Sequence, residues 1–203
     1  MHAPAFYAYK QSCQMRMMSA SGRRSGGHVV HSTIAGRAGG ITALLVLAAL
    51  AASAALAEPT KPARAEGGQY FDADGAPTYN IRPDGTVDWA TYSGYRRYHA
   101  ECHVCHGPDG EGSTYAPGLV GSLKTMTHDE FVAVVVQGRQ GNAAGKPSVM
   151  PSFGTNTNVM CYLDDIYVYL RARAEGALPR VRLEKREDKP KAATDAERTC
   201  LGE

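Results

Sequence analysis

The segment Cys102-His103-Val104-Cys105-His106 limits what this chain can fold around more than any other part of the sequence. Cysteines at positions i and i+3 of a helical turn present both thiols to one side, and a histidine directly behind them extends over the same face. Three kinds of site use such a pattern: covalent attachment of haem, a zinc site, and a dithiol that cycles through a disulfide. Each makes a different demand on the rest of the chain.

The N-terminal part of the chain has the features of a secretory signal peptide. Residues 41–57 are an uncharged, apolar run that ends in Ala55-Leu56-Ala57, and the residues before the run include five basic and no acidic side chains. We therefore expect residues 1–57 to be removed on export and the remainder to work in the periplasm. Retention as a membrane anchor is the alternative, which the short, alanine-rich run disfavours.

Removing this leader reverses the net charge. The whole chain has 22 basic and 20 acidic residues, and the leader takes five of the basic ones and none of the acidic ones, which leaves 17 against 20. A mildly acidic, exported protein is poorly suited to bind nucleic acid. We expect a monomer with no nucleic-acid partner.

The mature chain divides by composition into three parts. Residues 58–87 are rich in glycine, proline and aspartate, which predicts an extended arm. Residues 88–175 contain three helical patterns separated by glycine-rich loops. From Leu178 onward 13 of 26 residues are charged, so residues 176–203 are predicted to be a solvated, flexible tail.

Capping residues mark the predicted helices. Asp88 is a candidate N-cap for a first helix that runs toward the cysteines. Thr127 and Glu130 form a capping box for a second helix, which Gly138 ends. A third helix begins near Asn158, where apolar residues recur at helical spacing.

The predicted fold class is all-α, with few residues available for the hydrophobic core. Residues 107–126 and 138–158 have the composition of loops, so three helices must supply the interior of a domain of roughly 90 residues. A domain this small often needs a metal, a disulfide or a cofactor to complete its interior.

Of the three kinds of site, covalent haem fits the whole chain best. Cys102 and Cys105 would form thioethers and His106 would be the proximal iron ligand, and haem attachment of this kind takes place after export. A zinc site needs further ligands, but the chain has no second C-x-x-C or H-x-x-x-H pair. A thioredoxin-like dithiol should follow a strand, whereas a helix rich in aromatic residues precedes these cysteines. We therefore expect one covalent haem c.

Haem iron also needs a sixth ligand, or must leave that position open. Met150 is the favoured ligand because Pro151 stiffens its loop. The other candidates in the sequence are Met126, Met160, His99, His103 and His128. A Met/His pair raises the reduction potential and fills the sixth position, which suits an electron carrier. An open position would instead allow a small haem enzyme such as a peroxidase.

From Gly94 to Leu170 the sequence resembles the class I c-type cytochromes. The resemblance implies a small fold of three main helices around one covalent haem. It implies that Gly94 and Tyr98 lie at a close crossing with the last helix, where Tyr169 or Tyr167 would supply the aromatic partner.

The same resemblance extends to the segment "APGL" after the cysteines. It implies that the carbonyl of Pro117 accepts a hydrogen bond from His106 and so fixes the imidazole. Leu119 would pack on the face of the haem.

Residues 79–126 and 159–174 bear a narrower resemblance to the methanol-metabolism-related c-type cytochromes, a family with four cysteines. It implies a periplasmic carrier of single electrons rather than an enzyme. Its donor would be a methanol or alcohol dehydrogenase that uses pyrroloquinoline quinone, and its acceptor a downstream cytochrome or a terminal oxidase.

Two cysteines outside the motif, Cys161 and Cys200, remain in the mature chain. Their even number and the oxidising compartment favour a disulfide that ties the tail to the third helix. Two free thiols are the alternative.

Overall fold

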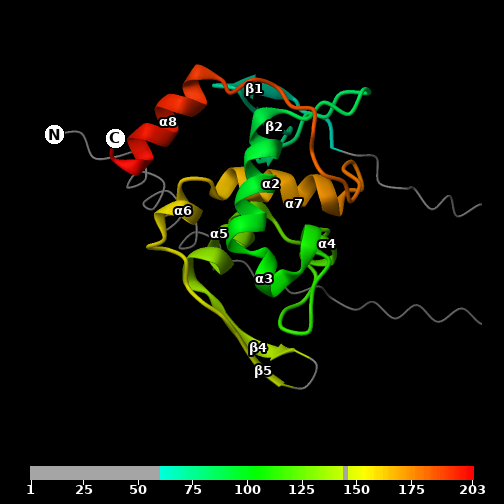
Figure 1. The fold of residues 1–203 in the computed structure, drawn as a ribbon, viewed down its shortest axis with the longest axis vertical. Helices are drawn as coiled ribbons and strands as arrows, with labels where there is room; N and C mark the ends of the chain where they lie inside the picture. The colour runs from blue at the N-terminus through cyan, green and yellow to red at the C-terminus, as the bar shows by residue number, and fades with distance from the viewer. Residues whose placement is uncertain (1–59, 144–145) are drawn as a thin grey trace, which may run out of the picture. The chain divides into compact units, whose positions relative to one another are not determined.

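The computed structural model describes residues 60–143 and 146–203, so the predicted signal peptide lies outside the described residues. Helices dominate this part of the chain, together with two small antiparallel sheets (Figure 1). In chain order the elements are β1 (Arg64–Glu66), β2 (Gln69–Phe71), β3 (Pro77–Thr78), α2 (Trp89–Glu101), α3 (His103–His106), the 3₁₀ turn η1 (Pro108–Gly110), α4 (Leu119–Ser122), α5 (His128–Gln137), β4 (Arg139–Ala143), β5 (Lys146–Met150), α6 (Thr157–Met160), α7 (Leu163–Ala174) and α8 (Lys191–Leu201).

The centre of the fold is the crossing of α2 over α7, visible in Figure 1. A Cβ atom on Gly94 would lie 1.8 Å from the backbone oxygen of Asp165, so only glycine permits this approach. One turn further along α2, the rings of Tyr98 and Tyr169 lie 5.6 Å apart. Tyr169 is therefore the aromatic partner at the crossing, whereas Tyr167 packs against Phe131 of α5.

The predicted helix starts are confirmed by their hydrogen bonds. The carboxylate of Asp88 accepts from the backbone N–H of Thr91 at 2.9 Å and begins α2. Thr127 and Glu130 form the predicted capping box of α5. The helix ends at Gly138, whose φ of 74° suits a residue without a Cβ.

The third predicted helix is divided into α6 and α7. Tyr162, with φ of −128° and ψ of 18°, interrupts the helical backbone between them. Residues beyond this break form the long helix, and Leu163, Ile166 and Leu170 on it are buried as the sequence pattern predicted.

The segment expected to be an extended arm instead folds into a three-stranded antiparallel sheet in the order β1-β2-β3. Gly67 and Gly68 make the first turn with positive φ values. The sheet is fastened to α7 by a 2.8 Å ion pair between Asp72 and Arg171, both largely buried. The prediction of an extended arm was wrong because two glycine turns let the chain fold back on itself.

Residues 138–158, expected to be a loop, contain the hairpin of β4 and β5. Arg139 pairs with Met150 at the end of the hairpin nearest the helices. The polar and small residues of this segment did not predict strands. The two strands are paired through backbone hydrogen bonds, which any residue except proline can donate, so no particular side-chain pattern is needed.

The tail, expected to be solvated and flexible, is also structured. Leu178 and Leu183 are 4% and 9% exposed, and α8 follows them. Cys161 and Cys200 form the predicted disulfide, with a Cα–Cα distance of 5.7 Å. The tail was predicted to be flexible from its number of charged residues. A few apolar side chains and one disulfide are nevertheless enough to order such a segment.

Candidate functional site

The C-x-x-C-H motif lies at the junction of α2 and α3, below the α2–α7 crossing in Figure 1. Cys102 ends α2 and Cys105 lies in the single turn of α3. The thiol of Cys102 is partly buried and that of Cys105 is exposed, and neither is in a disulfide. Burial, with Glu101 nearby, raises the pKa of the Cys102 thiol to about 12. The two thiols are thus presented on one helical turn, as the spacing predicted.

His106 is buried at 8% exposure, and its orientation is fixed by one hydrogen bond. Its Nδ1 lies 3.0 Å from the carbonyl oxygen of Pro117. A carbonyl can only accept, so Nδ1 carries the hydrogen, and in the neutral ring Nε2 then keeps its lone pair. This is the tautomer that a metal-binding imidazole needs, and the hydrogen bond to Pro117 is the one that the resemblance implied.

Glycines allow the chain to turn sharply after His106. Gly107 has φ of 73°, and a Cβ atom there would lie 2.1 Å from the backbone oxygen of Gly112. The N–H of Gly112 in turn donates to the carbonyl of His106 at 2.7 Å. The loop therefore closes tightly behind the histidine and returns Pro117 to its ring.

Two further side chains hold this loop. The hydroxyl of Tyr98, which is fully buried, donates to the carbonyl of Gly107 at 2.6 Å. The hydroxyl of Ser113 donates to the carbonyl of Cys105. Sequence reasoning assigned Tyr98 only an aromatic role and did not single out Ser113, because neither hydrogen bond connects residues with a local sequence signature.

Asp109 is a third brace, at the turn η1. It is the one described residue other than glycine with a positive φ, 56°. Its carboxylate accepts from the hydroxyl of Tyr169 at 3.1 Å and lies 3.4 Å from both His99 Nε2 and Arg180 Nε. Contacts from α2, α7 and the tail therefore meet at the residue three positions after His106.

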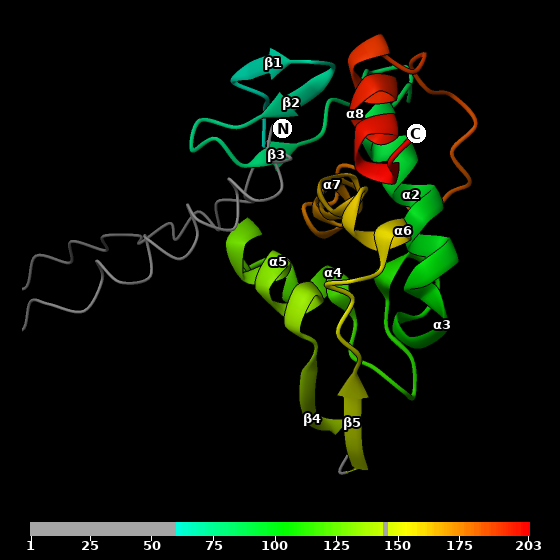
Figure 2. The same cartoon turned by 90° about the vertical axis from the view of Figure 1, so that its left-hand side faces the viewer.

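Met150 ends β5 and is partly buried against the core. The chain after it is tied to the end of α5: the N–H of Phe153 donates to Val135 at 3.0 Å, and the hydroxyl of Ser152 donates to Val136 at 2.6 Å. In Figures 1 and 2 the hairpin lies at the same end of the domain as α3. The Met150 segment is thus held firmly by α5.

The other candidates for a sixth ligand are in different settings. His128 Nε2 lies 2.8 Å from a carboxylate oxygen of Asp164 and is committed to that pair. His99 and His103 each contact a backbone carbonyl four residues earlier through Nδ1. Met126 and Met160 are partly buried against the core. Leu119, the predicted pocket residue, opens α4 and is also packed at the edge of the core.

These features fit a covalently attached haem. The motif offers two thiols outside any disulfide on one turn and an imidazole that contacts Pro117 through Nδ1 rather than Nε2. Within residues 60–143 and 146–203, no group of three or more His, Cys, Asp or Glu side chains is placed to hold a metal ion, so the zinc alternative lacks its ligand cluster there.

Three large apolar side chains next to these residues are exposed. Val104, between the two cysteines, is 73% exposed, Tyr115 in the loop before Pro117 is 75% exposed, and Val149 beside Met150 is 71% exposed. We call these three residues the motif surface. Exposed apolar side chains beside functional residues are typical of interaction surfaces.

The chain is similar to known proteins. A family model described as "Cytochrome C oxidase, cbb3-type, subunit III" matches residues 90–170. Cytochrome c-553I of Paracoccus denitrificans is 54% identical over 140 residues, which are 69% of this chain and 62% of that protein. Cytochrome c-555 of Methylococcus capsulatus is 41% identical over 100 residues, 49% of this chain and 75% of that protein.

A solved structure is similar as well. The crystal structure of the c-type cytochrome XoxG from Methylobacterium extorquens AM1 matches with a TM-score of 0.66 and 58% sequence identity, and the match covers 70% of this chain and 87% of that one.

Proposed function

Because this chain belongs to the c-type cytochromes, which bind haem c covalently and carry electrons, we propose that it takes single electrons from a methanol or alcohol dehydrogenase that uses pyrroloquinoline quinone. It passes them to a downstream cytochrome or a terminal oxidase, as a monomer in the periplasm. The similarity to XoxG and to cytochrome c-553I carries the assignment as a methanol-oxidation-related electron carrier. The particular donor rests on the narrower resemblance of residues 79–126 and 159–174.

In this proposal, Cys102 and Cys105 would hold the haem through thioethers, and His106 and Met150 would bind its iron. When bound, the haem iron supplies a reversible one-electron change between its ferric and ferrous states. The protein's part is to hold its ligands still. The hydrogen bond from His106 Nδ1 to Pro117 fixes the imidazole, and the ties between the Met150 segment and α5 fix the thioether.

With both His106 and Met150 bound to the iron, peroxide or oxygen would find no place to bind, which would favour electron transfer over the peroxidase alternative. The relatives are cytochromes, electron-transfer proteins rather than enzymes, in agreement with this role. Leu119 and Pro117 complete the pocket on the side of the histidine.

The motif surface supports contact with redox partners. Val104, Tyr115 and Val149 flank the residues proposed to hold the haem, so a partner that covers them approaches the haem closely. Contact of apolar side chains with water is unfavourable, and a partner protein that covers them removes this contact.

None of the helices in the described ranges is both long and apolar enough to cross a membrane.

Stopped-flow reduction tests the donor. The haem-loaded protein is mixed with a quinoprotein methanol dehydrogenase and its alcohol, and reduction is followed in the haem spectrum. We expect the dehydrogenase to reduce the cytochrome faster than an unrelated protein of similar charge does when it replaces the dehydrogenase. Tyr115→Ser should slow it, whereas Ala196→Ser on the exposed face of α8 should not. Equal rates for the dehydrogenase and the unrelated protein would remove the donor assignment and leave the cytochrome assignment standing.

A further inference from the structure

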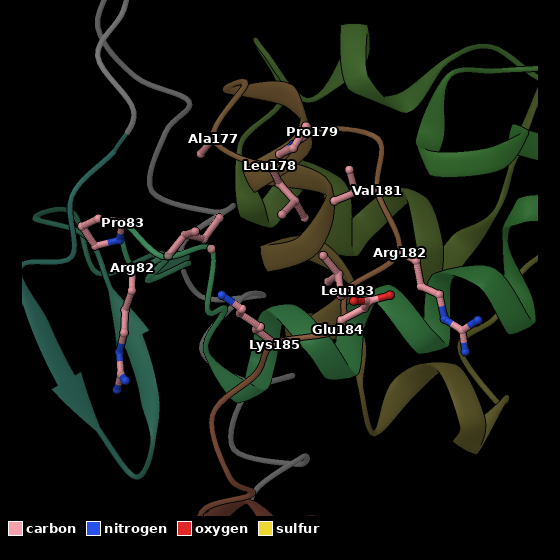
Figure 3. Close-up of a pocket in the computed structure, with 12 residues that line it drawn as sticks. Arg82, Pro83, Ala177, Leu178, Pro179, Val181, Arg182, Leu183, Glu184 and Lys185 are labelled. Atoms are coloured by element: carbon pink, nitrogen blue, oxygen red, sulfur yellow. The ribbon is translucent and has the colours of Figure 1, made fainter.

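A second surface feature lies away from the proposed haem ligands. Two chain segments, residues 81–85 and 177–185, line an open pocket of about 410 Å³, which we call the tail pocket (Figure 3). None of the six residues proposed to hold the haem lines it. Pockets of this size are typical of binding sites. The function of the haem site neither requires nor explains it.

The floor of the tail pocket is apolar. Leu178 and Leu183 are buried there, and Ile81 packs at the edge of the core beside them. Val181, also in the lining, is 50% exposed and is the one highly exposed large aliphatic residue of the described chain outside the motif surface. An apolar side chain from another molecule would cover Val181 and exclude water from this floor.

The rim carries three basic side chains, Arg82, Arg182 and Lys185, against one acidic side chain, Glu184. Arg82 is paired with Glu187 at 2.7 Å. The amino group of Lys185 donates to the backbone carbonyl of Asp84 at 3.2 Å, and the Asp84 carboxylate is close enough to interact with its charge.

Arg182 forms no ion pair with any carboxylate in the described part of the chain. Arg182 is therefore the rim cation most available to an anionic group on a bound molecule, and Lys185 beside it adds to the local positive charge. This excess of positive charge contrasts with the net negative charge expected for the mature chain.

The pocket is walled by chain segments on two sides only. A small molecule would remain largely in water there, whereas small-molecule sites bury most of their ligand. Residues 182–184 lie outside any helix or strand, and their N–H groups donate no hydrogen bond to another described backbone group. An extended segment of another protein could pair with them while it filled the pocket.

We propose that the tail pocket is a docking site for a partner protein that offers an apolar side chain flanked by acidic ones. The apolar side chain packs on Leu178, Val181 and Leu183, and the acidic ones meet Arg182 and Lys185. The wall of the pocket is braced on the haem-binding loop, because Arg173 contacts both Leu178 and Glu111. This inference does not depend on which dehydrogenase supplies the electrons.

The test uses the reduced, haem-loaded protein with labelled methyl groups, titrated with the capped peptide Asp-Leu-Glu. Shifts of the Leu178, Val181 and Leu183 methyl resonances are expected, and they should weaken as salt is added. Capped Lys-Leu-Lys and Asp-Ser-Glu should bind at least about tenfold more weakly, because each lacks one of the two recognised features.

Charge-reversal variants supply the matched control. Arg182→Glu combined with Lys185→Glu should weaken binding of Asp-Leu-Glu at least about fivefold. Lys191→Glu, on α8 and 88% exposed at its side chain, should leave it unchanged. An unaltered haem spectrum shows that each variant is folded.

Two results would overturn the inference. Equal binding of Lys-Leu-Lys and Asp-Leu-Glu would show that charge is not recognised. Binding of 4-methylpentanoate as tightly as the peptide would show that the pocket takes a free organic acid rather than a protein segment.

Discussion

The hydroxyl of Tyr98 donates a 2.6 Å hydrogen bond to the carbonyl oxygen of Gly107, the residue that follows His106. Tyr98 is fully buried within α2, so this bond anchors the start of the loop to the helix crossing. It links the packing of α2 on α7 to the position of the imidazole, since His106 and Gly107 share a peptide bond.

Tyr98→Phe should therefore destabilise the protein by about 1–3 kcal/mol, because it leaves a buried carbonyl without its donor. Denaturant unfolding of the haem-loaded protein measures the change. Tyr115→Phe, at an exposed position, should change the free energy of unfolding by less than about 0.5 kcal/mol. A loss in Tyr98→Phe no larger than in this control would mean that the hydrogen bond contributes nothing.

Met150→Ala tests the proposed sixth ligand. We expect loss of the weak near-infrared band between sulfur and ferric iron, a fall in reduction potential within the roughly 0.8 V range that axial ligands span, and binding of carbon monoxide by the ferrous protein. Met126→Ala is the matched control and should keep the band. If the band survives in Met150→Ala and disappears in Met126→Ala, the ligand assignment is wrong.

Gly94→Ala should be among the most damaging small substitutions in the chain. Its methyl group would lie 1.8 Å from the backbone oxygen of Asp165, so α2 and α7 would have to separate. We expect a loss of about 3 kcal/mol or more in the free energy of unfolding. Gly121→Ala, where a Cβ atom meets nothing within 4 Å, should be neutral or slightly stabilising. Equal effects would contradict the close crossing.

Asp165 should make the stability of the protein depend on pH. Removal of water from its carboxylate, with Asp164 and Asp88 nearby, raises the pKa to about 7 from 3.8. Between these pH values the folded state binds more protons than the unfolded state, so stability should fall as pH rises from about 4 to 7.

Asp165→Asn should abolish most of that fall and stabilise the protein at pH 8 by about 1–3 kcal/mol. Thermal or denaturant unfolding across this pH range measures it. Asp195→Asn, on the exposed side of α8, serves as the control and should leave the slope as it is. A wild-type profile that rises over the same interval would contradict the prediction.

The Cys161–Cys200 disulfide closes a loop of 39 residues. Replacing both cysteines with serine should cost roughly 3–4 kcal/mol in the chain-entropy model. Limited proteolysis should then cut between Leu183 and α8, while the haem spectrum stays unchanged because neither cysteine belongs to the C-x-x-C-H motif. An unchanged midpoint in both chemical unfolding and proteolysis would show that the tail is held without the disulfide.

Features that depend on residues close together in the sequence could be predicted. The spacing of Cys102, Cys105 and His106 indicated haem, and the caps at Asp88 and Thr127 marked where helices begin. These signals act within one or two turns of backbone, where the side chain and its partner are a few residues apart. The close crossing at Gly94 was implied by the resemblance to class I c-type cytochromes, and the cost of a glycine inside a helix agreed with it.

The sequence alone did not predict the sheet of β1 to β3, the β4–β5 hairpin or the order of the tail. Strands this short carry little side-chain pattern, and charged residues counted by composition hide the few apolar ones, such as Leu178 and Leu183, that pack on the core. The choice between Tyr167 and Tyr169 at the crossing likewise depended on how far α7 is rotated about its axis.

By itself, then, the sequence determined the chemistry of the site and the starts of its helices. Only the tertiary structure decided how the site is held: the bond from Tyr98 to Gly107, the contacts that converge on Asp109, and the ties from the Met150 segment to α5. These pairs lie between nine and 71 residues apart. Their geometry follows from the packing of whole elements, which no local spacing of residues encodes.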